Sequence, residues 1–442
     1  MSMSENKDKI FYDIAVIGGG ASGMACAIAA KRNKKVVASD ELSVGIFERN
    51  SKLGKKLLLT GNGRCNLTNK NIDLSNFHGN NVQFAIDALE KLPNEAVRDF
   101  FMEIGLHTFY DSDGRAYPES LSSASVLDCL RFSIQDLCID QHVSTYITGI
   151  QKTEESFTIF TSDDRKFYAR TVIIACGGSC SPFTGSDGNG YDLLKSFGHN
   201  IVYPIPGIVQ LKTDSGIVKP LSGIKIIARA SLLVDGIEVR SELGEVLFTD
   251  YGLSGPPILQ LSGLVSRALY QGIADRRKKN VVVSIDFMPQ IDEQDVLSNL
   301  RKRCIKFSSR RLDQLLVGWF HNRIATAIIK EATQKTMSSP ISELSDPEVV
   351  RLAILIKMLQ IKITGTMTLQ NAQITLGGVK TSELDRISME SKLCKGLFVC
   401  GEIMDIDGDC GGYNLQWAWS SGFAAAEGAL MYLADTSNEQ NN

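Results

Sequence analysis

Three glycines near the N-terminus have a spacing that suggests chemistry. Gly18, Gly20 and Gly23 form the pattern G-x-G-x-x-G directly after the apolar segment YDIAVI, with Ala21 and Ser22 inside it. The first glycine permits a tight turn, the second lets the backbone approach a pyrophosphate, and the third lets a helix pack on a strand. The N-terminus of that helix then presents N–H groups to the phosphates. The pattern predicts a dinucleotide site.

An acid stands at the end of the second apolar segment, VGIFERN. Glu48 lies about 25 residues past Gly23, and Arg49 follows it. A carboxylate in this place accepts hydrogen bonds from the hydroxyls of a ribose. The strand before the glycines, the helix after them and Glu48 favour nucleotide binding over a glycine-rich turn without a ligand.

The distant segment GLFVCGEIMDIDGDCGGYN favours FAD over NAD. It places Asp405 in a loop between an expected strand and an expected helix. Flavoenzymes commonly use such an element to hold the ribityl and pyrophosphate groups, and the helix N-terminus stabilises negative charge on the reduced flavin. The run from Asp405 to Asp409 also resembles part of a calcium loop, but it lacks the glutamate at the twelfth position. We expect FAD and no metal.

Three further segments are rich in glycine. GKKLLLTGNGRCNLTN (54–69) carries donors that suit FAD, although a structural loop closed by its asparagines is the alternative. ACGGSCSPFTGSDGNGYD (175–192) follows a strand, where the backbone is expected to approach a ligand. FTDYGLSGPPILQLS (248–262) puts Ser254 just before a proline-started helix. Tyr251 in that segment is either a wall of the substrate cavity or a packed aromatic.

Composition excludes several classes of protein. The 442 residues are 43% hydrophobic and 22% charged, as in globular proteins, and their net charge of −3 gives no basic field for nucleic acid. The sequence contains no run of 18 apolar residues, so we expect no membrane span. Its polar start lacks the apolar region of an export signal, so we expect a cytoplasmic protein. The ten cysteines form no C-x-x-C, and reduced thiols are favoured over a redox pair of Cys176 and Cys180.

The order of apolar patterns predicts an α/β protein with insertions. A β-α-β unit opens the chain, residues 82–107 are expected to be helical in two pieces around Pro93, and strands are expected over 143–175. Strands with one helix follow to about residue 290, and then amphipathic helices to about 357. The expected parts are a Rossmann-type FAD domain in two segments (1–198 and 371–436), a β-barrel-like insertion (199–290, with a return strand in 351–370), a small helical domain (291–350) and a polar tail (437–442).

These motifs resemble the HI0933-type flavoproteins, a family that includes bile-acid dienone reductases and aminoacetone-oxidase-like proteins. The resemblance covers nearly 420 residues, in blocks that include GGGASGM, GKKLLLTGNGRCNLTN, GRAYPESLSSASVLDCL, GEVLFTDYGLSGPPILQLS and CGEIMDIDGDCGGYNLQWAWSSG. It implies the three-part architecture, with Gly61, Arg64, Cys65 and Asn66 at the cofactor and Asp405 and Gly411–Asn414 at the flavin. The chain departs from the family at Ala175-Cys176-Gly177, where relatives read A-T-G, and at Cys180-Ser181-Pro182, where they read S-Y-P.

The candidate site residues fall into two sets. Those expected at the cofactor are Gly18, Gly20, Ala21, Ser22, Gly23, Glu48, Arg49, Lys56, Gly61, Arg64, Cys65, Asn66, Ala175, Gly177, Gly401, Asp405, Gly411, Gly412, Tyr413 and Asn414. Those expected to donate to the substrate are Tyr251, Ser254 and Tyr413, with Tyr117 as a further candidate.

The resemblance implies three alternative functions. The first is reduction of a C=C bond in a small apolar substrate that bears a carbonyl, such as a 3-oxo-4,6-diene bile acid, with NAD(P)H as electron donor. The second is oxidation of an amine or aminoketone by O2. The third, from another class of function, is a flavin-bearing binding or electron-transfer protein, with an RNA-associated form that the acidic pI disfavours. A second G-x-G-x-x-G for NAD(P)H is absent from the sequence, and the oligomeric state stays open.

Overall fold

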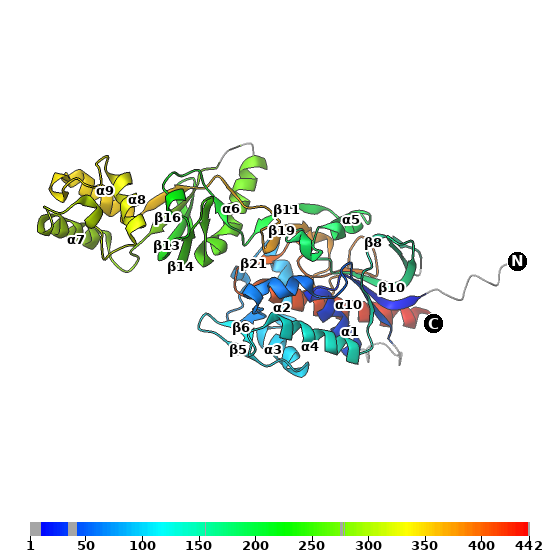
Figure 1. Ribbon diagram of the computed structural model, residues 1–442. Helices are drawn as coiled ribbons and strands as arrows, with labels where there is room; N and C mark the ends of the chain where they lie inside the picture. The colour runs from blue at the N-terminus through cyan, green and yellow to red at the C-terminus, as the bar shows by residue number, and fades with distance from the viewer. Residues whose placement is uncertain (1–9, 34–41, 155, 275–276, 278, 441–442) are drawn as a thin grey trace. The chain divides into compact units, whose positions relative to one another are not determined.

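The structure is a computed structural model that describes residues 10–33, 42–154, 156–274, 277 and 279–440. The chain divides into two compact units (Figure 1): unit 1 combines Met1–Ile205 with Gln373–Asn442, and unit 2 is Pro206–Ala372. Both ends of the chain therefore build unit 1, and unit 2 is inserted between them. The expected α/β fold with an interrupted dinucleotide-binding domain is confirmed.

Unit 1 is organised around a sheet with a parallel centre. The parallel strands at its centre are rich in Val, Ile and Phe and are largely buried, which is typical of parallel strands that are covered on both faces. β10 (Lys166–Ile174) pairs in parallel with β20 (Leu397–Val399) through its second half and antiparallel with β9 (Phe157–Thr161) through its first half. In spatial order the strands are β7 (Asp140–His142), β2 (Val44–Phe47), β1 (Phe11–Ile17), β10 (Lys166–Ile174), β9 (Phe157–Thr161) and β8 (Ile147–Lys152), with β20 (Leu397–Val399) also beside β10.

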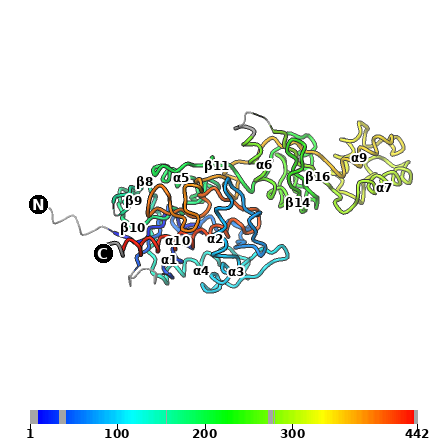
Figure 2. Tube along the Cα trace, turned by 180° about the vertical axis from the view of Figure 1, so that it is seen from behind, coloured from blue at the N-terminus to red at the C-terminus, as the bar shows by residue number. Residues whose placement is uncertain are grey.

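Two helices that are far apart in sequence form the centre of unit 1. α1 (Ala21–Arg32) and α10 (Tyr413–Gln440) lie side by side in Figures 1 and 2. Residues 22–30 of α1 are all buried, so the helix is covered all round. A Cβ on Gly422 would lie 2.7 Å from the carbonyl oxygen of Ser22, so small residues allow this close packing. The first and last parts of the chain therefore share one core.

The remaining elements of unit 1 cover this centre. The expected pair of helices around Pro93 is present as α2 (Ile86–Lys91) and α3 (Asn94–Glu103). The others are β3 (Thr68–Asn69), β5 (Thr108–Tyr110) and β6 (Arg115–Pro118) in one small sheet, β4 (Phe77–His78) paired with β21 (Asp407–Gly408), β11 (Ile201–Gly207) paired with β19 (Ile374–Val379), α4 (Ser123–Asp136) and α5 (Asn189–Lys195).

Unit 2 contains an antiparallel sheet that closes as expected of a barrel-like domain. The strands run in the order β17 (Leu359–Lys362), β16 (Val281–Asp286), β13 (Lys225–Val234), β14 (Ile237–Phe248), β15 (Gly252–Ser254), β12 (Leu211–Lys212) and β18 (Gly365–Thr366). Only Ile363 and Thr364 separate the two outermost strands. Their N–H groups donate to the carbonyls of Val281 and Lys212, so one segment borders both ends of the sheet. The helix α6 (Pro256–Ala274) packs against β13 and β14.

Three helices extend the core of this sheet. α7 (Glu293–Lys306), α8 (Asn322–Ala332) and α9 (Asp346–Lys357) share one buried apolar cluster with the strands. α9 begins at a capping box in which Ser345 and Glu348 satisfy each other's backbone N–H groups. This helix ends at Lys357, as the amphipathic pattern to about residue 357 predicts, and the return strand expected within 351–370 follows it. That strand begins only at Leu359, because the apolar residues before it follow a helical period.

Part of each end of the chain lies within the described residues. α10 continues to Gln440, so the segment 437–440 of the expected polar tail is helical, while residues 441–442 lie outside the described residues. The polar start, residues 1–9, also lies outside them. Among the helices that the structure describes, none is long and apolar enough to cross a membrane.

Candidate cofactor site

The glycine turn after β1 is fixed by close contacts with the backbone. Gly18 has a φ of +110°, and a Cβ there would lie 2.5 Å from the carbonyl oxygen of Ala175. A Cβ on Gly23 would lie 2.0 Å from the carbonyl oxygen of Gly18. Gly20, in contrast, has nothing within 4 Å of its Cβ position. Two of the glycines are therefore needed for packing, and the third faces open space where a ligand can approach.

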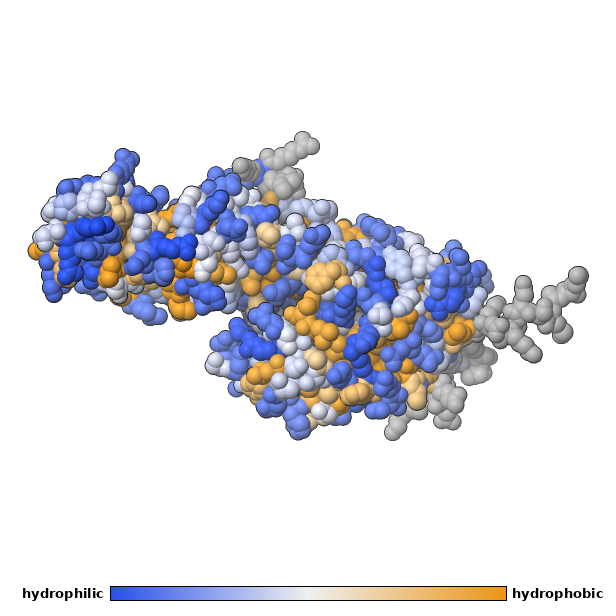
Figure 3. Space-filling model, in the orientation of Figure 1, coloured by the Kyte–Doolittle hydropathy of each residue, from blue (hydrophilic) through white to orange (hydrophobic). Residues whose placement is uncertain are grey.

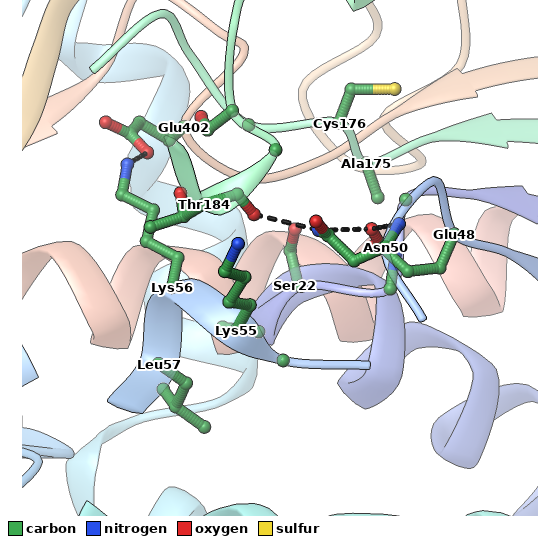
Figure 4. Close-up of a pocket in the computed structure, with 18 of the residues that line it drawn as sticks. Ser22, Glu48, Asn50, Lys55, Lys56, Leu57, Ala175, Cys176, Thr184 and Glu402 are labelled. Carbon is green, nitrogen blue, oxygen red and sulfur yellow. Dashed lines mark hydrogen bonds and ion pairs between the residues drawn. The ribbon is translucent and has the colours of Figure 1, made fainter. Parts of the chain in front are cut away.

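Glu48 is buried beside this turn. Its Oε2 accepts from the N–H of Gly19 at 3.0 Å, and its Oε1 accepts from the backbone N–H and the side-chain amide of Asn50 at 2.8 and 2.7 Å. Asn50 also donates to the carbonyl oxygen of Thr184 at 2.8 Å (Figure 4). The carboxylate is thereby held in one orientation, and Oε2, which accepts one of these bonds, keeps acceptor capacity for a ribose hydroxyl.

A cavity opens in front of the turn, within unit 1. It encloses about 1120 Å³, including space open to solvent. Half of the residues expected at the cofactor line it: Gly18, Gly20, Ala21, Ser22, Glu48, Arg49, Lys56, Ala175, Gly177 and Asn414. Sequence reasoning missed other lining residues, among them Asn50, Lys55, Thr60, Tyr146, Thr184, Ser186, Gln373, Glu402, Leu415 and Ala418. The lining residues come from both ends of the chain, as the predicted two-segment domain requires.

Lys56 and Glu402 form an ion pair on the wall of this cavity. Lys56 Nζ lies 2.6 Å from Glu402 Oε2 and 2.8 Å from Cys180 Sγ, and Figure 4 shows the lysine pointing toward the carboxylate. Glu402 Oε1 accepts from the N–H of Thr375 at 2.7 Å. Burial alone raises the pKa of Glu402, but the Lys56 cation and these hydrogen bonds outweigh it and hold the pKa below its usual range. The pair ties the segment 54–69 to the C-terminal segment.

A second group of expected cofactor residues lies at the start of α10, outside the cavity lining. A Cβ on Gly412 would lie 2.8 Å from Asn66 Oδ1, and one on Gly61 would lie 3.0 Å from the N of Asn66. Asn66 Oδ1 is buried and has no hydrogen-bond partner among the described residues. The guanidinium of Arg64 stacks 5.1 Å from the ring centre of Tyr117. Asn66 therefore presents an acceptor that a ligand can satisfy.

The acids of the C-terminal segment are buried and held by strand pairing. Asp405 Oδ2 accepts from the N–H of Asn80 at 3.1 Å. Asp409 Oδ1 lies 2.8 Å from His78 Nε2, where β21 pairs with β4. Asn414, which lines the cavity, donates to the carbonyl oxygens of Gly408 and Asp409 at 2.7 and 3.2 Å. The His78–Asp409 pair was missed because these residues lie far apart in sequence and no local motif joins them.

Other expected residues take separate places. Gly401 donates its N–H to Ser421 Oγ at 3.0 Å, and Tyr413 packs edge-on against Phe77. Tyr251 and Ser254 belong to unit 2, where Ser254 pairs with Leu247 between β15 and β14. Their role toward a substrate stays a prediction.

Cys176 and Cys180, the two cysteines considered as a redox pair, are not joined to each other. All ten are free thiols. Burial raises the pKa of Cys176 to about 12, and nearby Glu48 adds to the shift. Burial and Glu402 likewise raise the pKa of Cys180 to about 12. Burial also raises the pKa of Cys65 to about 12. Protonated thiols are poor nucleophiles, so this fits the expected reduced cysteines.

The residues present fit FAD. The open space at Gly20 and the fixed Glu48 suit the pyrophosphate and ribose of an ADP group. The unsatisfied Asn66 Oδ1 beside Gly412 suits a flavin edge that bears N–H. Within the described residues, no group of three or more His, Cys, Asp or Glu is placed to hold a metal ion. The fold and the cavity thus define a dinucleotide-binding flavoprotein.

Known proteins narrow this class to one family. The HI0933-like protein Rossmann domain matches residues 12–428, so the chain belongs to the HI0933-like family and is an FAD-dependent oxidoreductase. It is 34% identical over 416 residues to a 3-dehydro-bile acid delta(4,6)-reductase from Clostridium scindens, covering 94% of this chain and 98% of that protein. It is 28% identical over 426 residues to a ribosomal RNA dihydrouridine synthase from Escherichia coli, covering 94% and 97%.

A solved structure supports the fold. The 3-ketosteroid delta1-dehydrogenase from Sterolibacterium denitrificans superposes with a TM-score of 0.50 at 12% identity, covering 95% of this chain and 99% of that one. At this identity the likeness concerns the fold alone.

The two glycine roles predict two different mutant phenotypes. Gly23→Ala places a methyl group against the carbonyl oxygen of Gly18, so we expect a loss of about 1–3 kcal/mol in the free energy of unfolding. Gly20→Ala meets no protein atom, so we expect near-normal stability but at least about tenfold weaker FAD binding, equivalent to 1.4 kcal/mol. Urea unfolding and flavin fluorescence titration measure these quantities. Wild-type FAD affinity in Gly20→Ala would show that this backbone does not approach the cofactor.

Removal of the Lys56 cation is expected to destabilise the protein near neutral pH. Lys56→Met leaves Glu402 half-buried without its cation, and we expect a loss of about 2 kcal/mol, since 25% and 21% of the two side chains still reach solvent. In the wild type, the lowered pKa of Glu402 stabilises the folded protein at pH values above the ordinary pKa of a carboxyl group. This stabilisation is lost as the pH falls through the lowered pKa. In the variant, burial without the cation raises that pKa, so the loss of stability is largest near neutral pH and shrinks as the pH falls and Glu402 is protonated.

Urea unfolding across the acid range measures this change. Lys55→Met is the matched control, because the exposed Lys55 donates only to the carbonyl oxygen of Phe183. Addition of Glu402→Gln to Lys56→Met should restore part of the lost stability, since the uncompensated charge is then gone. Equal stability of Lys56→Met and Lys55→Met would contradict the assigned ion pair.

Proposed function

We propose that this protein reduces a C=C bond conjugated to a carbonyl group in a small apolar substrate. The observation that carries the proposal is the 34% identity, over nearly the full length of both proteins, to a bile acid delta(4,6)-reductase. A 3-oxo-4,6-diene steroid, such as a bile acid, is the proposed substrate class. FAD, when bound, supplies the hydride for such a reduction.

The residues of unit 1 have defined roles in this proposal. The turn from Gly18 to Ser22 and Glu48 bind the ADP half of the cofactor. Asp405, Asn66 and the Gly411–Asn414 turn are proposed to hold the flavin half, as the family resemblance implies. The helix N-terminus that follows this turn favours negative charge on the flavin.

The reaction also needs donors on the protein. Reduction of a conjugated enone shifts negative charge to the carbonyl oxygen, which a hydrogen-bond donor stabilises, and a proton must be added to carbon. Tyr413, Tyr251 and Ser254 are the candidates predicted from the sequence, with Tyr117. His78 joins them, because Asp409 orients its ring beside the segment that leads to Asn414.

In turnover, His78→Gln is expected to slow product formation without slowing the reduction of the flavin by the electron donor.

NAD(P)H is the proposed electron donor. The described residues contain one cavity with the glycine turn of a dinucleotide site. We therefore propose that the nicotinamide visits the flavin transiently and has no dedicated Rossmann-type site of its own.

A second candidate substrate is a uracil base in RNA. The ribosomal RNA dihydrouridine synthases of Escherichia coli and Haemophilus influenzae are 28% and 27% identical to this chain over nearly its full length. Formation of dihydrouridine also saturates a C=C bond conjugated to a carbonyl, so it makes the same demands on the donors. Oxidation of an aminoketone by O2 is the remaining alternative.

An anaerobic assay separates these alternatives. The FAD-loaded protein is mixed with NADH, NADPH or aminoacetone while the flavin absorbance is followed, and the reduced protein is then mixed with a 3-oxo-4,6-diene steroid or a uridine-containing RNA. We expect bleaching by NADH or NADPH and recovery of the absorbance with the steroid, together with a product reduced at one C=C bond. Recovery with RNA alone supports the second candidate. Bleaching by aminoacetone alone, or by none of the three, would contradict the proposed reduction.

A further inference from the structure

The net charge of the whole chain hides an uneven distribution between the two units. Residues 206–372 contain 22 Lys and Arg against 16 Asp and Glu, although the whole chain has a net charge of −3. Six of these cations stand in the eleven residues RKRCIKFSSRR (301–311), which contain no acid. This segment covers the second half of α7 and the turn after it. A local basic field is therefore present in unit 2.

Three cations of this segment remain available for a ligand. Arg301 is paired with Asp346, and Arg311 is paired with Asp313. Lys302, Lys306 and Arg310 are exposed, and none of them has an ion-pair partner within the described part of the chain. Lys302 and Lys306 are four residues apart on α7, so they lie on the same face of the helix.

Two aromatic rings lie beneath arginines of this segment. The guanidinium of Arg303 lies 5.3 Å from the ring centre of Phe307 and 5.2 Å from that of Trp319. Arg310 lies 4.1 Å above Phe307. Arg303 also donates to the carbonyl oxygens of Leu315 and Val317 at 2.9 and 3.0 Å, which fixes its plane. The result is a ledge on which the guanidinium groups of Arg303 and Arg310 lie over aromatic rings.

A hollow of about 780 Å³, including space open to solvent, adjoins this ledge. It is lined by Lys302, Arg303, Lys306, Phe307 and Trp319 together with Met288, Ile291, Val296 and Asn299. Figure 3 shows hydrophilic residues over the end of unit 2 that carries α7 and α9, with apolar residues among them. We call Lys302, Arg303, Lys306, Phe307, Arg310 and Trp319 the α7 surface.

We propose that the α7 surface binds single-stranded RNA. Lys302, Lys306 and Arg310 contact successive phosphates, and the ledge of Arg303, Phe307 and Trp319 accepts an unstacked base. Aromatic and guanidinium planes within a cationic groove are the combination that single-stranded nucleic acids require.

The geometry favours RNA over two other anionic partners. A membrane needs aromatic side chains that project from the surface, but both rings are partly buried and covered by cations. An acidic protein needs cations but gains nothing from the stacked ledge. RNA uses both features. The inference goes beyond the proposed C=C reduction and does not depend on it, yet a steroid has no phosphates, so RNA binding here would favour the uracil substrate.

The test uses the full-length, FAD-loaded protein and a fluorescein-labelled single-stranded RNA of mixed sequence. Fluorescence anisotropy gives the dissociation constant at several salt concentrations. We expect Lys302→Gln/Lys306→Gln/Arg310→Gln to weaken binding at least about tenfold and to lower the salt slope by about 2, roughly 0.7 for each lost phosphate contact on a single strand. Lys219→Gln/Lys330→Gln/Lys362→Gln removes the same charge from exposed lysines outside the α7 surface and should change the constant less than about twofold.

Tryptophan fluorescence supplies a second readout. Trp417 and Trp419 are buried at 1% and 0% exposure, so quenching by bound RNA is expected to come from Trp319 and to disappear in Trp319→Phe. Equal weakening by both triple variants, or no binding by the wild type, would overturn the proposal. Equal sensitivity to the α7 variant with vesicles of anionic lipid or with polyglutamate would assign the surface to those partners instead. None of these outcomes affects the reduction assay, so the two proposals fail separately.

Discussion

The packing of α1 against the turn that precedes it is the constraint on which the cofactor site depends. The Cα of Gly23 lies so close to the carbonyl oxygen of Gly18 that a side chain cannot fit between them. Gly18 is in turn held against Ala175, at the end of the neighbouring strand β10. These contacts place the N-terminus of α1 at the carboxyl edge of the parallel sheet. That edge is where open α/β sheets bind their ligands.

The C-terminal part of the chain depends on this arrangement. A Cβ on Gly401 would lie 2.4 Å from Ser22 Oγ, and Gly422 packs against the backbone of the same serine. The second segment of unit 1 therefore packs directly against the start of α1. The Lys56–Glu402 ion pair and Asn414 complete the cavity wall. A long insertion between the two segments is tolerated because the core of unit 2 is a separate cluster.

The sequence predicted those parts of the site that depend on local backbone geometry. The turn at Gly18–Gly23, Glu48 and the two-segment domain were all readable, because spacing and apolar period decide them. The partners of Lys56 were not, since Glu402 is 346 residues away and only the fold brings them together. His78 and Asp409 meet for the same reason. The end of α9 near residue 357 was readable from its amphipathic period, whereas the start of the return strand within 351–370 was not, because a helix end and a strand compete within a short apolar run.

The net charge of a whole chain likewise does not predict the charge of a local surface. The net charge of −3 argued against nucleic acid, but it sums an acidic unit 1 and a basic unit 2. What a ligand meets is the local field, such as that of α7, where cations are stacked on Phe307 and Trp319.

The most direct test of the account compares FAD with FMN on the apoprotein by isothermal titration calorimetry. The glycine turn and Glu48 are assigned to the ADP half of the cofactor, which FMN lacks. FAD is therefore expected to bind at least about 100-fold more tightly than FMN, equivalent to about 2.8 kcal/mol. Equal affinities for the two flavins would contradict it, because the contacts at Gly18–Ser22 and Glu48 would then contribute nothing to cofactor binding.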